Sequence, residues 1–407
     1  VSSTGRQAAS SERRSPSCDA VGTIAALKKT ILMLTQEYPP FRGGIATYAE
    51  QVARAAAELG HSVTVLAPSF GASESADAIE QAGKRLSVDR YRGGHYHARD
   101  LPAHLARIAM RICRGRFDLI HAVDFPNALA MHLLRPFLRK RNVCTVHGTD
   151  VLGFLSSRHV RLLRAQGVFD GASHVYANSE YTKRELCARR PRVCPKTTAT
   201  GLGVDRFWLQ SCESEHDVRG SLGADPKASI VLTVGRIDPR KGHDIGVEVV
   251  ARLNKDGIDA VYVVAGKGND AGFADLVRDR AEQLGVSLYM TGAVSGEELR
   301  ELYQSADVFL LPAVQRNDTI EGFGLVLLEA AAQGLPSVTT AVGGIPEAVA
   351  DGASGVVCKA GDVESMASAS KRIIAEPSYR ASLSRGAKKL AQERTWTRVA
   401  ESIYGAA

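Results

Sequence analysis

Short runs of β-branched and apolar residues alternate with longer stretches that have the spacing of amphipathic helices along almost the whole chain. This alternation is typical of parallel sheets covered by helices on both faces. In the first half the pattern predicts helices that include Ile45–Leu59 and Leu101–Arg114, and strands at Thr30–Thr35, Ser62–Ala67, Leu119–Val123, Asn142–His147, Val175–Asn178 and Lys196–Thr200.

The alternation stops at Arg206–Asp225, a polar and acidic stretch, and then restarts. The second half predicts strands at Ile230–Val234, Ala260–Ala265, Leu288–Thr291, Val308–Leu311, Ser337–Thr340 and Gly355–Cys358. Because 407 residues are too many for one comfortable core, we expect two domains. The predicted organisation is a disordered tail at 1–26, a first domain at 27–207, a linker at 208–227, a second domain at 228–385 and a helical segment at 386–407 that crosses back to the first domain.

The composition is that of an ordinary globular protein, and no stretch approaches the ~20 apolar residues of a membrane span. The first twenty residues lack the apolar core of a secretory signal. The seven cysteines form no Cys-x-x-Cys pair, which favours a reducing compartment with neither a zinc site nor a disulfide framework. We therefore expect a cytoplasmic protein.

The net charge of +7 hides an uneven distribution. Residues up to Gln210 carry 30 Lys and Arg against 17 Asp and Glu, whereas the rest of the chain carries 21 against 27. Much of the excess lies in Arg99–Arg141 and in Arg158, Arg161 and Arg164. Such a cluster is either a solvated face or a surface attracted to an anionic membrane or an acidic acceptor. No basic-aromatic motif accompanies it, so we expect no nucleic-acid partner.

Glu321 and Glu329, eight positions apart, are the most informative polar pair. Glu321 precedes a glycine-rich turn, whereas Glu329 lies inside the apolar run Leu325–Ala332, which predicts a buried helix. A carboxylate is almost never buried without a partner, so Glu329 belongs either to a structural salt bridge or to a ligand site. The glycine-rich turn offers N–H groups to an anion, and carboxylates beside it accept hydrogen bonds from sugar hydroxyls.

Further candidates follow the carboxyl ends of predicted strands, where ligands bind in such sheets. Arg236 and Lys241 come after the first strand of the second domain and are spaced to grip two phosphates of one diphosphate. His147 ends a strand of the first domain, with Asp150 near enough to fix its tautomer. A lone histidine at a strand end is otherwise a hydrogen-bonded structural residue.

Four residues on other strand-end loops complete the set. Gly43 and Gly44 let the backbone approach a phosphate closely, and the loops of Gly266 and Val294 together form a slot for a base. The glycine pair lacks the Gly-x-Gly-x-x-Gly spacing of dinucleotide sites, which disfavours a nicotinamide enzyme. No Asp-x-Asp occurs, so we expect no metal and no other cofactor, and cations must neutralise the diphosphate.

Together these elements resemble the retaining glycosyltransferases of family 4, over about Lys28 to Ala407. The Glu-x7-Glu element combined with the Arg236 and Lys241 pair is the specific part of this resemblance. The resemblance implies an α/β protein with the GT-B fold, in which two Rossmann-like domains with parallel sheets face each other across a cleft.

The resemblance also implies roles for the candidate residues. Arg236 and Lys241 would hold the diphosphate of a nucleotide-sugar donor, and Glu329 would accept hydrogen bonds from the ribose hydroxyls. His147 would contact the transferred sugar. The donor hexose would meet Glu321 and the backbone of Phe323, Gly324 and Leu325, and the phosphate and acceptor side would meet Gly43 and Gly44.

The implied function is metal-independent transfer of a hexose to a glycan or lipid-linked acceptor by front-face displacement, with retention of the anomeric configuration. Double displacement through a carboxylate nucleophile is the alternative mechanism. Two other functions stay open: a non-catalytic protein that binds nucleotide sugars or an anionic membrane surface, and a GT-B epimerase of nucleotide sugars. A peripheral position at the inner face of the membrane fits the basic first half. The pattern leaves open which sugar, nucleotide and acceptor are used.

Overall fold

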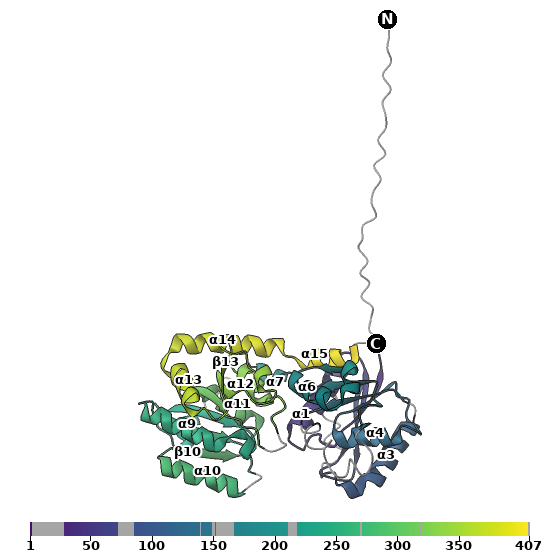
Figure 1. Ribbon diagram of the computed structural model, residues 1–407, viewed down its shortest axis with the longest axis horizontal. Helices are drawn as coiled ribbons and strands as arrows, with labels where there is room; N and C mark the ends of the chain where they lie inside the picture. Colours follow the sequence, from purple (N-terminus) through teal and green to yellow (C-terminus); the bar gives the residue numbers. More distant parts are fainter. Residues whose placement is uncertain are drawn as a thin grey trace.

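The computed structural model describes Val1 and residues 28–71, 85–138, 140–148, 151, 167–210, 218–268, 271–316 and 320–405. Within them, two α/β domains lie side by side, each built on one parallel sheet (Figure 1). The predicted fold class is confirmed. Outside the described residues lie most of the predicted tail, Asp150, and the arginines at 158, 161 and 164.

The first sheet has seven strands in the order β3-β2-β1-β4-β5-β6-β7. Their bounds are β1 Thr30–Leu34, β2 Ser62–Pro68, β3 Leu86–Tyr91, β4 Leu119–Ala122, β5 Asn142–Val146, β6 His174–Ala177 and β7 Thr197–Ala199. Ile31 of β1 is in register with Val63 of β2 on one side and with Leu119 of β4 on the other. The helices of this domain are α1 Gly44–Glu58, α3 Leu101–Arg114, α4 Phe125–Leu134 and α6 Glu180–Arg189.

The second sheet has six strands in the order β10-β9-β8-β11-β12-β13. Their bounds are β8 Ser229–Val234, β9 Ala260–Ala265, β10 Leu288–Gly292, β11 Val308–Leu311, β12 Ser337–Thr340 and β13 Gly355–Cys358. Its helices are α9 His243–Lys255, α10 Ala271–Leu284, α11 Gly296–Ser305, α12 Leu325–Ala332, α13 Val363–Ala375 and α14 Pro377–Glu393. Both strand orders are doubly wound, so each sheet has a ligand-binding edge at the carboxyl ends of its central strands.

The strands agree with the predicted ones to within two residues, except that β3 was not predicted. β3 is the edge strand of its sheet, and Leu86 is its only buried residue. Asp89 and Arg90 interrupt its apolar pattern. The predicted linker region contains two short helices, α7 Arg206–Leu209 and α8 Val218–Leu222, on either side of residues 211–217, which are not described.

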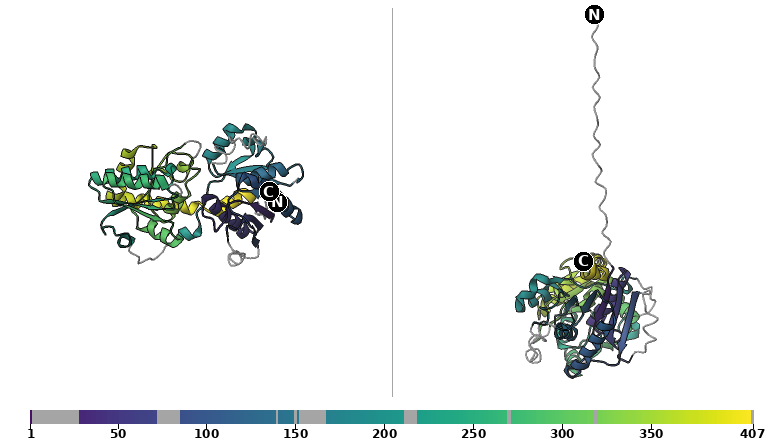
Figure 2. Two further views of the ribbon diagram at one scale, coloured as in Figure 1. Left: turned by 90° about the horizontal axis from the view of Figure 1, so that it is seen from below. Right: turned by 90° about the vertical axis from the view of Figure 1, so that its right-hand side faces the viewer.

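The C-terminal segment runs along both domains (Figures 1 and 2). α14 packs against α12 in the second domain, and α15 Trp396–Ala400 packs against α1 in the first. At the crossing, the Val204 N–H donates to the Arg394 carbonyl at 2.8 Å. A Cβ on Gly203 would lie 2.4 Å from the Trp396 nitrogen, so only glycine permits this approach.

A buried polar network fastens the end of the chain to the first sheet. The Tyr404 hydroxyl, in the π-helical turn Glu401–Gly405, lies 2.6 Å from His121 Nδ1, and His121 Nε2 lies 2.7 Å from the Thr145 hydroxyl. Burial lowers the pKa of His121 to about 3, so the ring is neutral and donates from one nitrogen while accepting at the other. Lys29 Nζ donates to the Tyr404 carbonyl at 2.8 Å.

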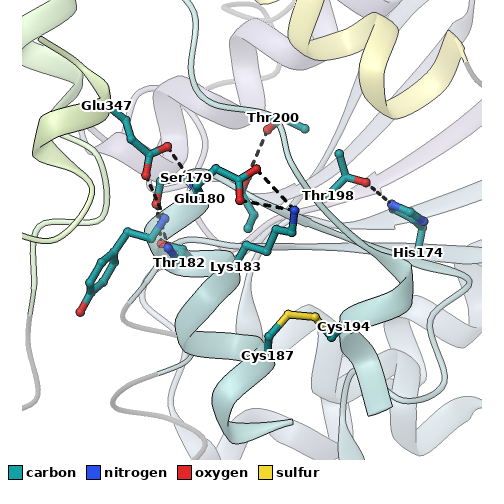
Figure 3. Close-up of polar contacts among 12 residues, drawn as sticks. His174, Ser179, Glu180, Thr182, Lys183, Cys187, Cys194, Thr198, Thr200 and Glu347 are labelled. Atoms are coloured by element: carbon teal, nitrogen blue, oxygen red, sulfur yellow. Dashed lines mark hydrogen bonds and ion pairs between the residues drawn. A yellow bond between two sulfur atoms is a disulfide. The ribbon is translucent and has the colours of Figure 1, made fainter. Parts of the chain in front are cut away.

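A second tie between the domains lies at the start of α6. The Glu347 carboxylate, from the second domain, accepts hydrogen bonds from the N–H groups of Glu180 and Tyr181, both at 2.8 Å (Figure 3). The first N–H groups of a helix have no partner within the helix, and the helix dipole favours negative charge there. Glu347 therefore acts as a capping residue supplied by the other domain.

The expectation that the cysteines form no disulfide was wrong. Cys187 at the end of α6 is bonded to Cys194 in the 3₁₀-helical segment Pro191–Lys196 (Figure 3). Cys-x6-Cys is not a recognised disulfide motif. The bond forms because the chain folds back after α6 and brings Cys194 next to Cys187. Of the other cysteines in the described ranges, Cys144 and Cys358 are buried thiols and Cys113 is exposed.

None of the helices within the described ranges combines the length and the apolar character that crossing a membrane requires.

We predict that Tyr404→Phe destabilises the protein by about 1–3 kcal/mol, because it leaves one nitrogen of buried His121 without a partner. The change should appear as a lower midpoint of thermal unfolding followed by circular dichroism. Tyr379→Phe is the control, because the half-buried Tyr379 ring packs under the Arg372 guanidinium and that contact survives the change. Equal midpoints for the two variants would contradict a stabilising role of this network.

Candidate functional site

Loops at the carboxyl ends of the two sheets touch each other. The Arg42 guanidinium, after β1, donates to the Val294 carbonyl, after β10, at 2.9 Å. A Cβ on Gly322 would lie 2.7 Å from the His147 carbonyl oxygen, so the loop before α12 lies directly on the loop after β5. The ligand-binding edges of the two domains therefore form one interdomain site.

Lys241 and Glu321 form an ion pair in this site, with 2.8 Å between Nζ and Oε2. Lys241 ends the 3₁₀ turn Pro239–Lys241 after β8, and both side chains are largely buried. Burial alone would raise the pKa of Glu321, but Lys241, with smaller contributions from Arg240 and Arg236, lowers it below the ordinary value. Glu321 is therefore ionised, as part of a cluster with excess positive charge.

Arg236 is the exposed member of that cluster. Within the described part of the chain, no oxygen lies within hydrogen-bonding or ion-pair distance of its guanidinium. Its backbone carbonyl is held by His243 Nε2 at 3.0 Å, which fixes the loop. Arg240 differs, because its guanidinium is 3.1 Å from the Asp238 carboxylate. Arg236 is thus the cation of this cluster that is open to an anion arriving between the domains, and Lys241 lies beside it with its charge shared with Glu321.

Glu329 lies on α12, and its partner is the Tyr303 hydroxyl, which donates to Oε2 at 3.0 Å. Burial raises the pKa of Glu329 to about 7, against the opposing effects of the Tyr303 hydrogen bond and of Lys241. The predicted helix Leu325–Ala332 is observed with the same bounds. A half-satisfied, buried carboxylate at the site is suited to accept further hydrogen bonds from hydroxyl groups.

The turn before α12 depends on glycine. Gly324 has φ +87°, in the left-handed region that disfavours other residues, and it is the N-cap of the helix. The Phe323 side chain is buried in the core, so Phe323 offers the site its backbone only. The first N–H groups of α12, beginning at Leu325, belong to the set that has no partner within a helix.

His147 is held by the first domain. Its Nε2 donates to the Val123 carbonyl at 3.0 Å, and its ring packs edge-on against Tyr48 with 4.8 Å between centroids. Burial lowers the pKa of His147 to about 4, so the ring is neutral at physiological pH. The hydrogen bond to the Val123 carbonyl therefore fixes the tautomer of His147, whereas Asp150, which was expected to do so, lies outside the described residues.

The predicted glycine loops take two different roles. Gly43 is the N-cap of α1, and a Cβ on it would lie 3.1 Å from both the Glu37 carboxylate and the Phe41 ring, whereas Gly44 is exposed and has open space around it. A Cβ on Gly266 would lie 1.9 Å from the Gly235 carbonyl, so Gly266 brings the loops after β8 and β9 together.

Two polar residues of the site, Glu37 and Asn178, were not singled out from the sequence. Glu37, in the loop after β1, has its pKa raised to about 7 by burial and by the nearby Asp124, and lowered by Arg236 across the interface. Asn178 at the end of β6 is buried, and its Oδ1 has no hydrogen-bond partner in the described structure. The sequence did offer one signal for Glu37, because it is an acidic residue between a predicted strand end and the glycine pair.

Among the described residues, no group of three or more His, Cys, Asp and Glu side chains is arranged to hold a metal ion.

Two family models match the chain, one for each domain. Residues 42–205 match Glycosyltransferase Family 4, and residues 214–390 match Glycosyl transferases group 1.

Two curated relatives match this chain over most of its length and most of their own. The GDP-mannose-dependent alpha-(1-6)-phosphatidylinositol monomannoside mannosyltransferase of Mycolicibacterium smegmatis is 30% identical over 359 residues, which cover 85% of this chain and 90% of the relative. The D-inositol 3-phosphate glycosyltransferase of Stackebrandtia nassauensis is 29% identical, with 89% and 86% covered.

Among solved structures, Anabaena Alr3699/HepE in complex with UDP and glucose has a TM-score of 0.74 at 19% identity, covering 92% of this chain and 98% of that chain. This likeness supports the fold. Together with the family models and the curated relatives, it confirms the resemblance inferred from the sequence: the chain belongs to glycosyltransferase family 4, has the GT-B fold and is a glycosyltransferase.

Proposed function

We propose that this enzyme transfers a hexose from a nucleoside diphosphate hexose to a hydroxyl group of a glycan or lipid-linked acceptor, with retention and without a metal ion. The observation that supports this best is the convergence of Arg236, Lys241, Glu321 and Glu329 at the interdomain site. Two cations there match the charge of a diphosphate, and two carboxylates match the hydroxyl groups of a sugar and a ribose.

In the proposed reaction the acceptor oxygen forms a bond to the anomeric carbon while the bond from that carbon to the diphosphate oxygen breaks on the same face. The hydroxyl proton moves to the departing phosphate oxygen. Negative charge grows on the diphosphate, where Arg236, Lys241 and the N–H groups at the start of α12 stabilise it. Cations held in place before the reaction need no reorganisation, which is why they lower the barrier efficiently.

Front-face displacement fits this site better than double displacement does. A carboxylate nucleophile must be free to attack the anomeric carbon. Glu321 is instead ion-paired to Lys241, with 2.8 Å between Oε2 and Nζ, so its carboxylate is directed to a cation.

The donor is tested by incubating the protein with GDP-mannose, UDP-glucose, UDP-galactose and UDP-GlcNAc in EDTA and measuring the release of nucleoside diphosphate. GDP-mannose comes first because relatives that are 30–31% identical are named for it. We expect release from at least one donor in EDTA. Release that appears only after a divalent cation is added would contradict metal independence, and no release or binding with any donor would contradict the proposed function.

We predict that Lys241→Ala lowers turnover several hundredfold, on the scale of ~3 kcal/mol for one donor that stabilises a developing oxyanion. Initial rates of nucleotide release at saturating donor measure this effect. Lys255→Ala is the control, because Lys255 is an exposed lysine at the end of α9. A loss below tenfold for Lys241→Ala, with the fold intact by circular dichroism, would place the diphosphate elsewhere.

We predict that Glu329→Gln weakens donor binding and stabilises the free protein at pH 8. The folded-state pKa of Glu329 is raised to about 7 from an ordinary 4.5. Between these values the native state keeps a proton that the unfolded state has released, so stability falls as pH rises through this window. The thermal midpoint should therefore drop less between pH 5 and pH 8 in this variant than in wild type. Glu282→Gln, on the exposed face of α10, should behave like wild type.

We also propose that the first domain binds an anionic membrane surface that carries the acceptor. Phe137, after α4, is 82% exposed, and Arg135, Lys140 and Arg141 beside it in the sequence are exposed as well. A large apolar side chain among cations is suited to the interface of an anionic bilayer.

Accordingly, we predict binding to vesicles of phosphatidylcholine with phosphatidylglycerol that weakens as salt rises, and a several-fold loss for Phe137→Ser in a sedimentation assay. Leu276→Ser is the control, because Leu276 is 50% exposed on α10 in the acidic second half. Equal binding to neutral and anionic vesicles at low salt would remove the electrostatic part of this proposal.

A further inference from the structure

Three loops of the first domain bring an aromatic cluster to the side of the interdomain site. Phe41 follows β1, Phe70 follows β2 and His95 follows β3. The Phe41 and Phe70 rings stack with 5.0 Å between centroids, and His95 packs edge-on against them at 5.2 and 5.5 Å. The two phenylalanines are half-buried and His95 is exposed, so the cluster keeps surface open to solvent.

The backbone of Phe70 is held in an unfavourable conformation. Its φ is +45°, a region that residues with a Cβ rarely adopt and that costs of order 1–3 kcal/mol. The hydrogen bonds from Ser69 N–H to the Tyr91 carbonyl and from Phe70 N–H to the Gly93 carbonyl fix this turn to the loop after β3. Strain of this kind persists mainly where a side chain is held in place for a function.

Glu37 adjoins the cluster through Gly43. The Glu37 carboxylate and the Phe41 ring flank the same point above Gly43, each 3.1 Å from where a Cβ would be. Arg236 of the second domain, the cation assigned to the donor diphosphate, lowers the pKa of this carboxylate, so Glu37 adjoins the aromatic cluster and also feels the charge of the donor site.

A buried network holds the Glu37 loop in place from below. The Gln36 N–H donates to the Asp124 carboxylate at 2.5 Å, and the Tyr91 hydroxyl donates to the Gln36 side chain at 3.1 Å. The Thr35 hydroxyl donates to the Glu37 carbonyl at 2.8 Å. The loop is therefore positioned before any ligand arrives, which reduces the entropy lost on binding.

We propose that Glu37 and the Phe41, Phe70 and His95 cluster form the acceptor subsite, and that it takes a cyclic polyol, either a sugar or a cyclitol ring. This inference rests on the proposed sugar transfer. The C–H groups on one face of such a ring pack against aromatic rings, whose faces carry partial negative charge. The hydroxyl rim is left for Glu37, which accepts a hydrogen bond and orients the attacking oxygen toward the donor.

The chemistry of the cluster favours a ring over an alkyl chain as the occupant. An alkyl chain buried here would strip water from the Glu37 carboxylate and the His95 imidazole without replacing their hydrogen bonds, which is costly. A polyol satisfies both and still covers the phenyl rings. The alkyl part of a lipid-linked acceptor is then expected to leave the site toward solvent or membrane.

Acceptor kinetics test this subsite directly. Octyl α-D-mannopyranoside and D-inositol 3-phosphate serve as soluble acceptors, with the donor found in the release assay. Phe41→Leu should raise the acceptor KM about tenfold, on the scale of an aromatic contact, while the donor KM and acceptor-free nucleotide release stay within twofold of wild type. Phe41→Tyr, which keeps the ring, should restore the acceptor KM, and Glu37→Gln should lower kcat for transfer.

A binding measurement makes the outcome independent of turnover. In saturation-transfer NMR with GDP present, ring protons of methyl α-D-mannopyranoside or myo-inositol should receive saturation from wild type and lose most of it with Phe41→Leu. The control Leu276→Ala changes an exposed side chain on α10 of the second domain and should match wild type. Saturation unchanged by Phe41→Leu, or absent with wild type, would overturn the subsite. If wild type releases no nucleoside diphosphate from any donor, the result would instead count against the proposed function.

Discussion

The direct contact between the loop before α12 and the loop after β5 is the constraint on which the interdomain site depends. It brings the backbone of Gly322 against the His147 carbonyl, an approach that any Cβ would block. Because both loops are strand-end loops of rigid sheets, this one contact sets the distance between residues of the two domains. The Arg42 hydrogen bond to the Val294 carbonyl and the Glu347 cap on α6 act in the same direction.

The three glutamates of the site differ in charge state because their surroundings differ. Glu321 shares its environment with Lys241, Arg240 and Arg236, which outweigh the effect of burial. Glu329 and Glu37 lack an equally close cation, so burial dominates and raises their pKa to about 7. The site thus has one carboxylate that stays ionised and two that gain or lose a proton near neutral pH, and an incoming diphosphate or additional hydroxyl donors change this balance further.

Much of the fold followed from the sequence because each buried parallel strand is a short, continuous apolar run between helical stretches. The edge strand β3, with Asp89 and Arg90, shows where this signal fails. The need of Glu329 for a partner was evident from its apolar helix, but the identity of Tyr303 was not, since it depends on how α11 packs beside α12. The Lys241 and Glu321 pair likewise joins residues 80 positions apart, which spacing alone does not reveal. Glu37 was overlooked because its character depends on Asp124 and Arg236, both remote in sequence.

The main chain passes between the domains at two places that lie next to each other, after Val204 and again at Thr395, where the two segments form a parallel bridge. Two adjacent covalent connections restrain the domains from sliding past each other or separating. Rotation of one domain relative to the other about this point is the motion that they restrain least. Such a rotation opens the interdomain site more at positions distant from Val204 and Thr395 than at positions beside them. The hydrogen bond from Arg42 to the Val294 carbonyl crosses the same interface and adds to this restraint.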